Sequence, residues 1–507
     1  MVVIIFLMAV FASALELPSI FSSHMVLQRE FNTPIWGKAS TGEKITVSIS
    51  NQTKTALTGQ DSSWSVNLDS MKAGGPFVLT VKGKKDKKVF NDIMIGDVWL
   101  CSGQSNMWMP VKNLKNIPDS NAPAENSSLR LYSVWSPENS EYGQPLKWTK
   151  CTKEAALSFS AVGYYFGKNL QPSAGVTVGL IYNAMGGSVP EAWLPRSYLE
   201  QNPKLRPIIN FWDSIIVKYP NAEKIFYDSC LNKIRANALN GKVDSSLLEK
   251  NKILPFFTKA LRFYMFFPEI LYKNQLEPIL PFGLKGVVWY QGESSAERAA
   301  QYSELFPLMI NGWRKLFKQD NLPFVFTQLP NYAIKGTSWP ELRDAQNKTL
   351  SLPNTSMAVT IDLGELKDIH PNNKWDVGRR LALTALNNVY KLPVAATGPV
   401  LGNMEIKNDT VILTFNNAEK GLIVKCDSIH SFTVAGNDKV FYQAKAVVEK
   451  NRVILNTANV KSPIAVRYNW IGAPSCNLYN SDNLPTSPFR TDDWPGATDS
   501  QLVPIMK

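Results

Sequence analysis

The two end regions of the chain share a pattern in which hydrophobic and polar positions alternate. Short segments such as KITVSIS, SWSVNLD and FVLTVKG lie before residue 95, and TVILTFNNA, GLIVKCDS and KAVVEKNRVILNT follow residue 391. Gly, Asn and Lys residues separate these segments. Alternation with a period of two is typical of strands that bury one face. The pattern predicts an N-terminal β module over 15–95 and a C-terminal β module over 391–507.

The middle region of the chain, residues 96–390, has a different pattern. Unbroken apolar runs such as DVWLC, TVGLIY, GVVWY and PFVFTQ alternate with segments of helical periodicity, for example the one that carries Val377, Leu381, Ala385 and Val389. Strands that alternate with helices form a parallel sheet covered on both faces. We therefore predict an α/β fold with a three-layer core over 96–390, interrupted by a helical insertion at about 196–280.

The chain begins with a short apolar run, MVVIIFLMAVFASA. This run is too short to cross a bilayer, and it ends in the small residues Ala12, Ser13 and Ala14, as a secretory signal peptide does at its cleavage site. We predict a signal peptide at 1–14, with a buried first strand as the alternative, and no membrane anchor further along. The expected location is the secretory pathway, either outside the cell or in the lysosome.

Sequons and cysteines bear on the same compartment. Five Asn-X-Ser/Thr sequons predict N-glycans at some of Asn51, Asn126, Asn347, Asn354 and Asn408. The five cysteines are too widely spaced for a zinc or redox motif: Cys101, Cys151, Cys230, Cys426 and Cys476. In an oxidising compartment at most two disulfides can form, which leaves one thiol over, and the pairing stays open.

The charge of the chain changes this picture little. With 507 residues, of which 44% are hydrophobic, the chain can bury a large core, and its formal net charge is +12. Apart from KGKKDKK at 82–88, the Lys and Arg residues are scattered rather than gathered on one helix. We therefore expect a solvated basic surface and not a nucleic-acid site.

The segment DVWLCSGQSNMWMP places a serine where chemistry is expected. Ser105 follows a predicted strand and opens a helix, so its hydroxyl would stand at the carboxyl edge of the sheet, where α/β folds bind ligands. The chain has no G-x-S-x-G motif, and Gly103-Gln104-Ser105-Asn106 has the G-x-S-N form of a different group of esterases. The alternative is that Ser105 only caps a helix.

A general base is sought among three histidines. His370 lies just after the last strand of the alternating region, with Asp368 two residues earlier. A serine hydroxyl needs an imidazole to take its proton, and the imidazole needs a carboxylate to orient it, so these residues suit a triad. His24 and His430 lie in the two β modules and are predicted to be structural. No second histidine lies near His370, so a zinc site is not expected.

Acyl transfer also needs donors for an oxyanion, and two other strand ends offer them. The segment YNAMGGS ends in Gly186 and Gly187, whose backbone N–H groups can approach a ligand closely. The segment VVWYQGESS places Gln291 at the tip of its strand. The alternatives are a tight turn for the glycines and a capping role for Gln291.

Together, several long motifs resemble the sialate O-acetylesterase family, a branch of the SGNH hydrolases: LPSIFSSHMVLQRE, GDVWLCSGQSNM, NAMGGSVPEAW, LPFGLKGVVWYQGES, Arg343-Asp344-Ala345-Gln346 and IDLGELKDIHPNNKWDVGRRLA. The resemblance implies a flavodoxin-like SGNH core between the two β modules. It also implies removal of O-acetyl groups, notably the 9-O-acetyl group of sialic acids, through a serine acyl-enzyme and without a cofactor.

The resemblance further assigns roles to residues of this chain. It makes Ser105 the nucleophile, His370 the base and Asp368 the acid partner. It places the oxyanion between the N–H of Ser105, Gly187 and Gln291. Other SGNH hydrolases have the acid three residues before the histidine, whereas the gap here is two, so Glu365 stays a rival of Asp368.

Three other functions compete with this interpretation. A glycosidase could use Glu191 and Glu293, since paired carboxylates at a sheet edge cleave glycosidic bonds. Acetyl esters of plant or microbial polysaccharides, of the acetylxylan type, are an alternative substrate. A secreted glycan-binding protein on an inactive hydrolase scaffold is the alternative without catalysis, although no triad residue is missing from the sequence.

Overall fold

The computed structural model of the chain describes residues 14–134, 146–218, 266–425, 429, 431–475 and 478–504. The predicted signal peptide, apart from its last residue, lies outside the described residues, as do Cys230, His430, Cys426 and Cys476. Cys101 and Cys151, the two cysteines in the described ranges, are buried and free.

A parallel sheet forms the centre of the molecule, and its strands are β13 (Thr355–Ala358), β12 (Phe324–Thr327), β11 (Gly286–Tyr290), β7 (Lys87–Gly103), β10 (Val178–Ala184) and β8 (Asn126–Ser133), in that order. Each neighbouring pair is parallel. At the edge, β9 (Thr149–Cys151) joins β8 in the antiparallel sense. Every residue of β10, β11 and β12 is buried, which explains the unbroken apolar runs in the sequence.

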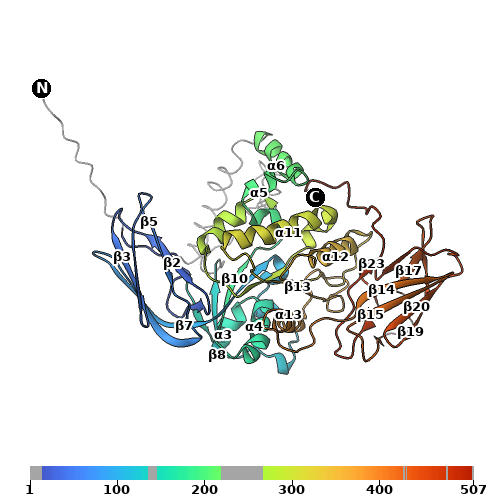
Figure 1. Cartoon of the computed structure of the whole chain (residues 1–507), viewed down its shortest axis with the longest axis horizontal. Helices are drawn as coiled ribbons and strands as arrows, with labels where there is room; N and C mark the ends of the chain where they lie inside the picture. Colours follow the sequence, from blue (N-terminus) through green and yellow to red (C-terminus); the bar gives the residue numbers. More distant parts are fainter. Residues whose placement is uncertain are drawn as a thin grey trace, which may run out of the picture.

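Helices cover both faces of this sheet (Figure 1), with α11 (Ala299–Leu316) and α12 (Ser338–Thr349) on one face, and α3 (Lys153–Ser158), α4 (Ala161–Ala174) and α13 (Lys374–Asn388) on the other. The ring centroid of Trp99 in β7 lies 5.0 Å from that of Phe166 in α4. Trp289 in the next strand stacks on Phe306 of α11, with 6.1 Å between the centroids. The predicted α/β three-layer core is thus confirmed.

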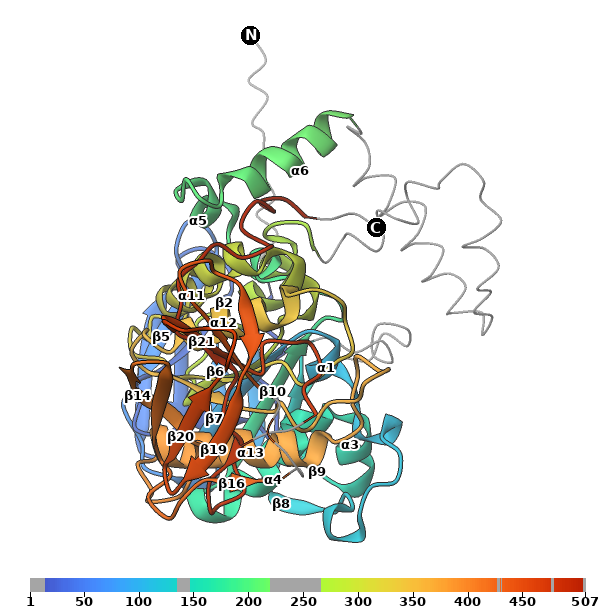
Figure 2. The same ribbon diagram turned by 90° about the vertical axis from the view of Figure 1, so that its right-hand side faces the viewer.

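Where the structure describes the expected insertion, it is helical. Its elements are α5 (Arg196–Glu200), α6 (Arg206–Lys218), a π-helical turn η6 (Tyr272–Leu276) and a 3-10 turn η7 (Glu277–Ile279). Figure 2 shows α6 extending beyond α11, away from the sheet. Residues 219–265, which include much of the predicted insertion, lie outside the described ranges.

The N-terminal module is built of strands, as its alternating sequence predicts: β1 (Val26–Gln28), β2 (Thr33–Lys38), β3 (Lys44–Ile49), β4 (Gln52–Leu57), β5 (Ser63–Leu68) and β6 (Gly74–Lys82). The first half of β7 pairs with β6 in the antiparallel sense, up to Ile95. From Asp97 onward the same strand pairs in parallel with β10. This strand of 17 residues therefore belongs to both the N-terminal module and the central sheet, and it crosses the boundary expected at 95 and 96.

The C-terminal module has a hydrophobic core of its own. One sheet contains β14 (Val400–Lys407), β15 (Thr410–Asn416), β20 (Arg452–Asn456) and β19 (Lys445–Glu449). The other contains β18 (Phe441–Gln443), β17 (Phe432–Ala435), β21 (Ala465–Tyr468) and β23 (Phe489–Arg490), while β16 (Ile423–Val424) pairs with β22 (Leu478–Tyr479). Leu413 and Val453 of the first sheet share one buried cluster with Val434 and Val466 of the second.

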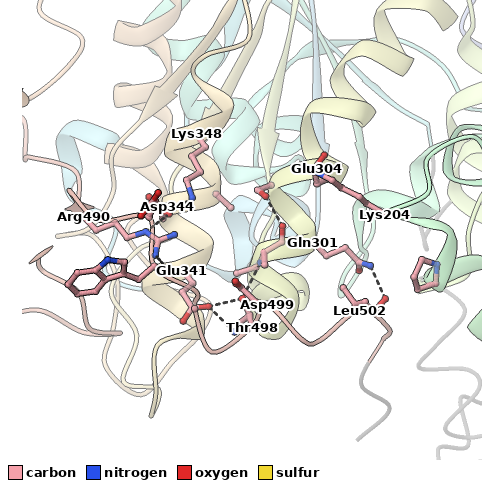
Figure 3. A pocket seen from close by; sticks show the side chains of 18 of the residues that line it. Lys204, Gln301, Glu304, Glu341, Asp344, Lys348, Arg490, Thr498, Asp499 and Leu502 are labelled. Carbon is pink, nitrogen blue, oxygen red and sulfur yellow. Dashed lines mark hydrogen bonds and ion pairs between the residues drawn. The ribbon is translucent and has the colours of Figure 1, made fainter. Parts of the chain in front are cut away.

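After the last strand, the chain returns to the central region and lies against α11 and α12 (Figure 1). Glu341 of α12 accepts hydrogen bonds from the backbone N–H groups of Ala497 and Thr498, at 2.9 and 3.0 Å. Gln301 of α11 donates to the carbonyl of Leu502 at 2.8 Å. A cavity of about 590 Å³ lies along this seam, and Figure 3 shows Glu341 and Gln301 holding the returning segment.

We expect Glu341→Gln to loosen this seam. In the wild type the N–H groups of Ala497 and Thr498 donate to the carboxylate of Glu341, whereas in the variant one of its two oxygens is replaced by an NH₂ group, which cannot accept. The loss of a hydrogen bond to a charged group lowers the free energy of unfolding by about 1.5–3 kcal/mol. Although burial acts in the opposite direction, hydrogen bonds from Thr337 and Thr498 hold the pKa of Glu341 below its usual value. This stabilisation is therefore full above the unfolded-state pKa of about 4.3 and disappears as the pH falls through the lower folded-state pKa.

Denaturant unfolding at pH 7 and at pH 3 measures this effect, with Glu304→Gln as the control, because Glu304 makes only an exposed ion pair with Lys204. The difference between wild type and Glu341→Gln should shrink at the lower pH. Equal losses in the two variants, or a loss that does not depend on pH, would contradict the role given to Glu341.

Candidate active site

The end of β7 forces the backbone into the turn that carries the serine. Gly103 has a φ of +137°, and a Cβ there would lie 2.1 Å from the carbonyl oxygen of Tyr290, so only glycine fits. The next N–H, of Gln104, donates to the same carbonyl at 3.0 Å. Ser105 then opens the short helix α1 (Ser105–Trp108), whose N-cap is Gln104. Ser105 is thus not the capping residue, and it stands at the carboxyl edge of the sheet.

The histidine predicted as base lies against this serine. Nε2 of His370 is 2.8 Å from Oγ of Ser105. Nδ1 of His370 is 3.8 Å from Oδ1 of Asp368, an oxygen that also accepts the backbone N–H of His370 at 2.8 Å. Glu365, the rival acid, instead accepts the backbone N–H of Asn372 at 2.7 Å. The arrangement can pass a proton from the serine to the imidazole.

The surroundings of His370 favour a neutral imidazole. Burial lowers the pKa of His370, the positive charge of Lys374 lowers it further, and Asp368 acts in the opposite direction. A neutral imidazole is the form that can accept the proton of a serine hydroxyl. We infer that His370 is ready to act as a base at neutral pH.

Ser105 and His370 open into a cavity of about 440 Å³. Its walls come from the ends of several strands: Gln104, Ser105, Trp108, Met109, Asn113, Gly186, Gly187, Glu293, Ser294, Ile369 and His370. A Cβ on Gly186 would lie 3.8 Å from that of Ser105, so the glycine turn runs beside this serine. Among these described wall residues there is no Lys or Arg.

The residues that form this cavity lie within a region that matches a known protein family. A model of the family described as carbohydrate esterase, sialic acid-specific acetylesterase, matches residues 95–244 and 269–387, which together are just over half of the chain. The chain belongs to this family of carbohydrate esterases. The matched stretches contain the serine turn, the glycine turn and the histidine loop.

Relatives of this esterase chain match along nearly its whole length. The sialate O-acetylesterase of Rattus norvegicus is 28% identical over 93% of each chain. That of Homo sapiens is 27% identical and covers 94% of this chain and 93% of its own. Among solved structures, a carbohydrate acetylesterase from Xanthomonas citri is 33% identical, covers 95% of this chain and all of its own, and has a TM-score of 0.77.

Within this carbohydrate esterase, Gln291 lies beneath the cavity and not in its wall. The side chain is fully buried, and Nε2 donates to the carbonyl of Ser188 and to Oγ of Ser295, both at 3.1 Å. Ser188 directly follows Gly187, so Gln291 holds the glycine turn in this structure. To donate to an oxyanion directly, the side-chain amide of Gln291 would have to give up its hydrogen bond to Ser188 or to Ser295.

The two carboxylates of the competing glycosidase interpretation do not meet at the cavity. Glu191 is fully buried and pairs with Arg298 at 2.6 Å. Only Glu293 reaches the cavity wall. A glycosidase needs both carboxylates beside the scissile bond, so this geometry does not favour one. Elsewhere, Nδ1 of His24 lies 2.7 Å from Asp92 in the N-terminal module, which agrees with a structural role.

The esterase site also contains residues to which sequence reasoning gave no role. Trp108, Met109 and Ile369 supply its apolar wall. Asn106, which follows Ser105, is fully buried and forms hydrogen bonds to Glu293, Ile369 and Lys374, the first residue of α13. The sequence signal was that Asn106 and Lys374 lie inside the motifs GQSNM and HPNNKW and that Trp108, Met109 and Ile369 lie next to them, because composition and periodicity do not show which side chains meet.

Proposed function

We propose that this carbohydrate esterase removes O-acetyl groups from sialic acids, notably the 9-O-acetyl group, through a serine acyl-enzyme. The hydrogen bond of 2.8 Å between His370 and Ser105 carries the proposal, because it lies in the cavity wall at the carboxyl edge of the sheet. The names of the mammalian relatives support the sialate substrate. The apolar residues Trp108 and Met109 beside the serine suit the sugar ring and its acetyl methyl group.

In the first step, Oγ of Ser105 attacks the acetyl carbonyl carbon while Nε2 of His370 takes the hydroxyl proton. The carbonyl oxygen becomes an oxyanion, which the N–H groups of Ser105 and Gly187 would stabilise, with Gln291 as the proposed third donor or as the support of the glycine turn. The C–O bond to the sugar then breaks, and His370 returns the proton to the sugar oxygen. The acetyl group remains on Ser105 as an ester.

The second step repeats the first with water. His370 takes a proton from a water molecule, the resulting hydroxide attacks the acetyl-serine, and His370 returns the proton to Oγ of Ser105 as the C–O bond breaks. Acetic acid leaves and gives its proton to solvent as acetate. Asp368 is proposed to hold the imidazole in the right tautomer and to stabilise its positive charge. Nδ1 of His370 and Oδ1 of Asp368 are 3.8 Å apart, and hydrogen bonds between catalytic groups often tighten in the complex with substrate.

Acetate release tests the proposed function directly. The assay compares 9-O-acetyl sialic acid, acetylated xylan and a chromogenic acetate, and a fluorophosphonate probe labels the active serine in parallel. Preferred release from the sialic acid, together with labelling of Ser105, supports the proposal. Release from no acetyl ester and no labelling would refute the esterase itself.

A neutral polysaccharide ester is the second candidate substrate. The observation in its favour is that no Lys or Arg occurs among the described residues that line the cavity, whereas a sialic acid carries a carboxylate. Preferred release from acetylated xylan would favour this candidate and leave the serine mechanism unchanged.

Gln291→Ala should lower turnover by roughly 10² to 10³, because an oxyanion donor acts mainly in the transition state. The Michaelis constant for the chromogenic acetate should change little. Gln319→Ala is the matched control, since its amide binds the backbone of Leu284 at the opposite end of β11. A higher Michaelis constant with unchanged turnover would instead make Gln291 a group that positions the substrate.

The secretory location and the N-glycans are also proposals. None of the helices in the described ranges is long and apolar enough to cross a membrane. Asn51, Asn354 and Asn408 are exposed and suit glycans best. Asn347 is a poorer acceptor site, because its Nδ2 donates to the carbonyl of Pro488 at 2.8 Å.

A further inference from the structure

The residue after the nucleophile joins three separate segments of the active site. Nδ2 of Asn106 donates to Oε1 of Glu293 and, at 3.0 Å, to the carbonyl of Ile369, the residue before the catalytic histidine. Its Oδ1 accepts a hydrogen bond of 2.5 Å from Nζ of Lys374. The side chain is fully buried. Every hydrogen-bonding group of this amide is therefore used to connect the serine turn with the histidine loop and the end of β11.

The lysine in this group is unusual in its surroundings. Lys374 is the first residue of α13, four positions after His370, and it is fully buried. Its Nζ lies 5.6 Å from the centre of the Tyr290 ring. A buried ammonium group is costly unless it is paired, and a lysine that only filled space could be replaced by an apolar residue. The short hydrogen bond from Nζ of Lys374 to Oδ1 of Asn106 indicates that the lysine fixes the position of this amide.

We propose that Lys374 is a positioning residue of the esterase, which acts through Asn106 to hold the Ser105 turn and the His370 loop in register. Glu293 completes the group by fixing the other end of the same amide. The inference rests on the proposed function, since Ser105 and His370 are the acyl-transfer pair. In this proposal Lys374 does not touch the substrate, because it is not among the residues that line the cavity.

The charges around Lys374 are consistent with this role. Burial lowers the pKa of Lys374 to about 7, while Glu293, Asp368 and Glu365 act in the opposite direction. Burial also raises the pKa of Glu293. The lysine in turn lowers the pKa of His370, which Asp368 raises. Removing the lysine must therefore have two separable effects, one on the geometry of the pair and one on the titration of His370.

Lys374→Met tests the geometry, since methionine fills similar space without a donor. Turnover of the chromogenic acetate, measured on the pH plateau above the pKa of His370, should fall about 10²-fold, the size expected for a displacement of reacting groups by about 1 Å. The Michaelis constant should stay within about twofold. The matched control is Lys367→Met, which makes the same change at an exposed position of the same loop. A plateau turnover within about threefold of wild type would overturn the inference.

A double-mutant cycle shows whether Lys374 acts through Asn106. Asn106→Ala should lower plateau turnover by a similar factor, and Lys374→Met should then add little in the Asn106→Ala background. Independent, multiplying losses would mean that Lys374 does not act through Asn106. Lys374→Met combined with Glu293→Gln removes both the buried ammonium group and the buried carboxylate whose charges act on each other. Thermal stability should then recover while turnover stays low. Recovery of both would make Lys374 a purely structural residue.

Proton NMR of the His370 imidazole supplies a readout that needs no substrate. The chain has three histidines, so His370→Asn identifies the resonance. In Lys374→Met the pKa of His370 should rise relative to wild type, and an unchanged titration would count against an electrostatic effect of Lys374 on His370. If wild type releases no acetate and takes up no fluorophosphonate, the proposed function fails, while this titration still decides whether Lys374 acts on the histidine loop.

Discussion

Ser105→Ala is expected to abolish acetyl release, with a loss of turnover on the order of 10⁶, as found when the nucleophile of a serine hydrolase is removed. The variant lacks the atom that forms the acyl-enzyme, and the remaining donors cannot replace it. Folding should be intact, because Oγ of Ser105 faces His370 at the cavity and not the core. Acetate release and fluorophosphonate labelling measure the loss, and a thermal melt checks the fold.

Ser102→Ala is the matched control for the nucleophile. Ser102 lies in β7, three residues before Ser105, and is fully buried, so its hydroxyl cannot reach a substrate. This variant should keep wild-type turnover. If Ser105→Ala retained even a tenth of the activity, the nucleophile would lie elsewhere.

Asp368→Asn is expected to lower turnover by about 10⁴, the size known for the loss of a triad acid. An asparagine leaves the imidazole in the wrong tautomer, so the nitrogen that faces Ser105 carries a proton and cannot accept another. The measurement is made above the pKa of His370, where the base is already neutral. The loss should persist there, which separates the tautomer effect from a simple shift of the titration.

Glu365→Gln is the comparison that decides the acid. In the structure Glu365 accepts the backbone N–H of Asn372, so its replacement should affect turnover only modestly. A larger loss in Glu365→Gln than in Asp368→Asn would reverse the assignment. Asp368 would then be a residue that caps the loop through the backbone N–H of His370.

The sequence predicted the layers of the fold because burial leaves a clear pattern. The strands β10, β11 and β12 have water on neither face, so their residues are apolar without alternation. It also predicted which strand ends gather at the site, since parallel strands end at the same edge of a sheet. Ser105, Gly187 and His370 could therefore be placed together from the pattern of the chain alone.

What the sequence could not predict depends on side-chain directions. Gln291 was expected to point at the reacting carbonyl, but its amide binds Ser188 and Ser295 inside the protein. The link from Lys374 to Asn106 joins residues 268 positions apart, and no local pattern records such a pair. Asp368 and Glu365 both lie within five residues of His370, so the sequence alone does not show which of them contacts it. The path of the loop places Asp368 beside His370 and Glu365 beside Asn372.

The continuous strand β7 joins the N-terminal module and the catalytic sheet into a single cooperative unit. The nucleophile turn follows the last residue of a strand whose first half is hydrogen-bonded to the N-terminal β6. We therefore expect loss of the β6–β7 pairing to be felt along the same backbone at Gly103 and Ser105. The helices α5 and α6 lie outside this strand, whereas the N-terminal module cannot be removed or replaced without cutting through β7, the strand that leads to Ser105.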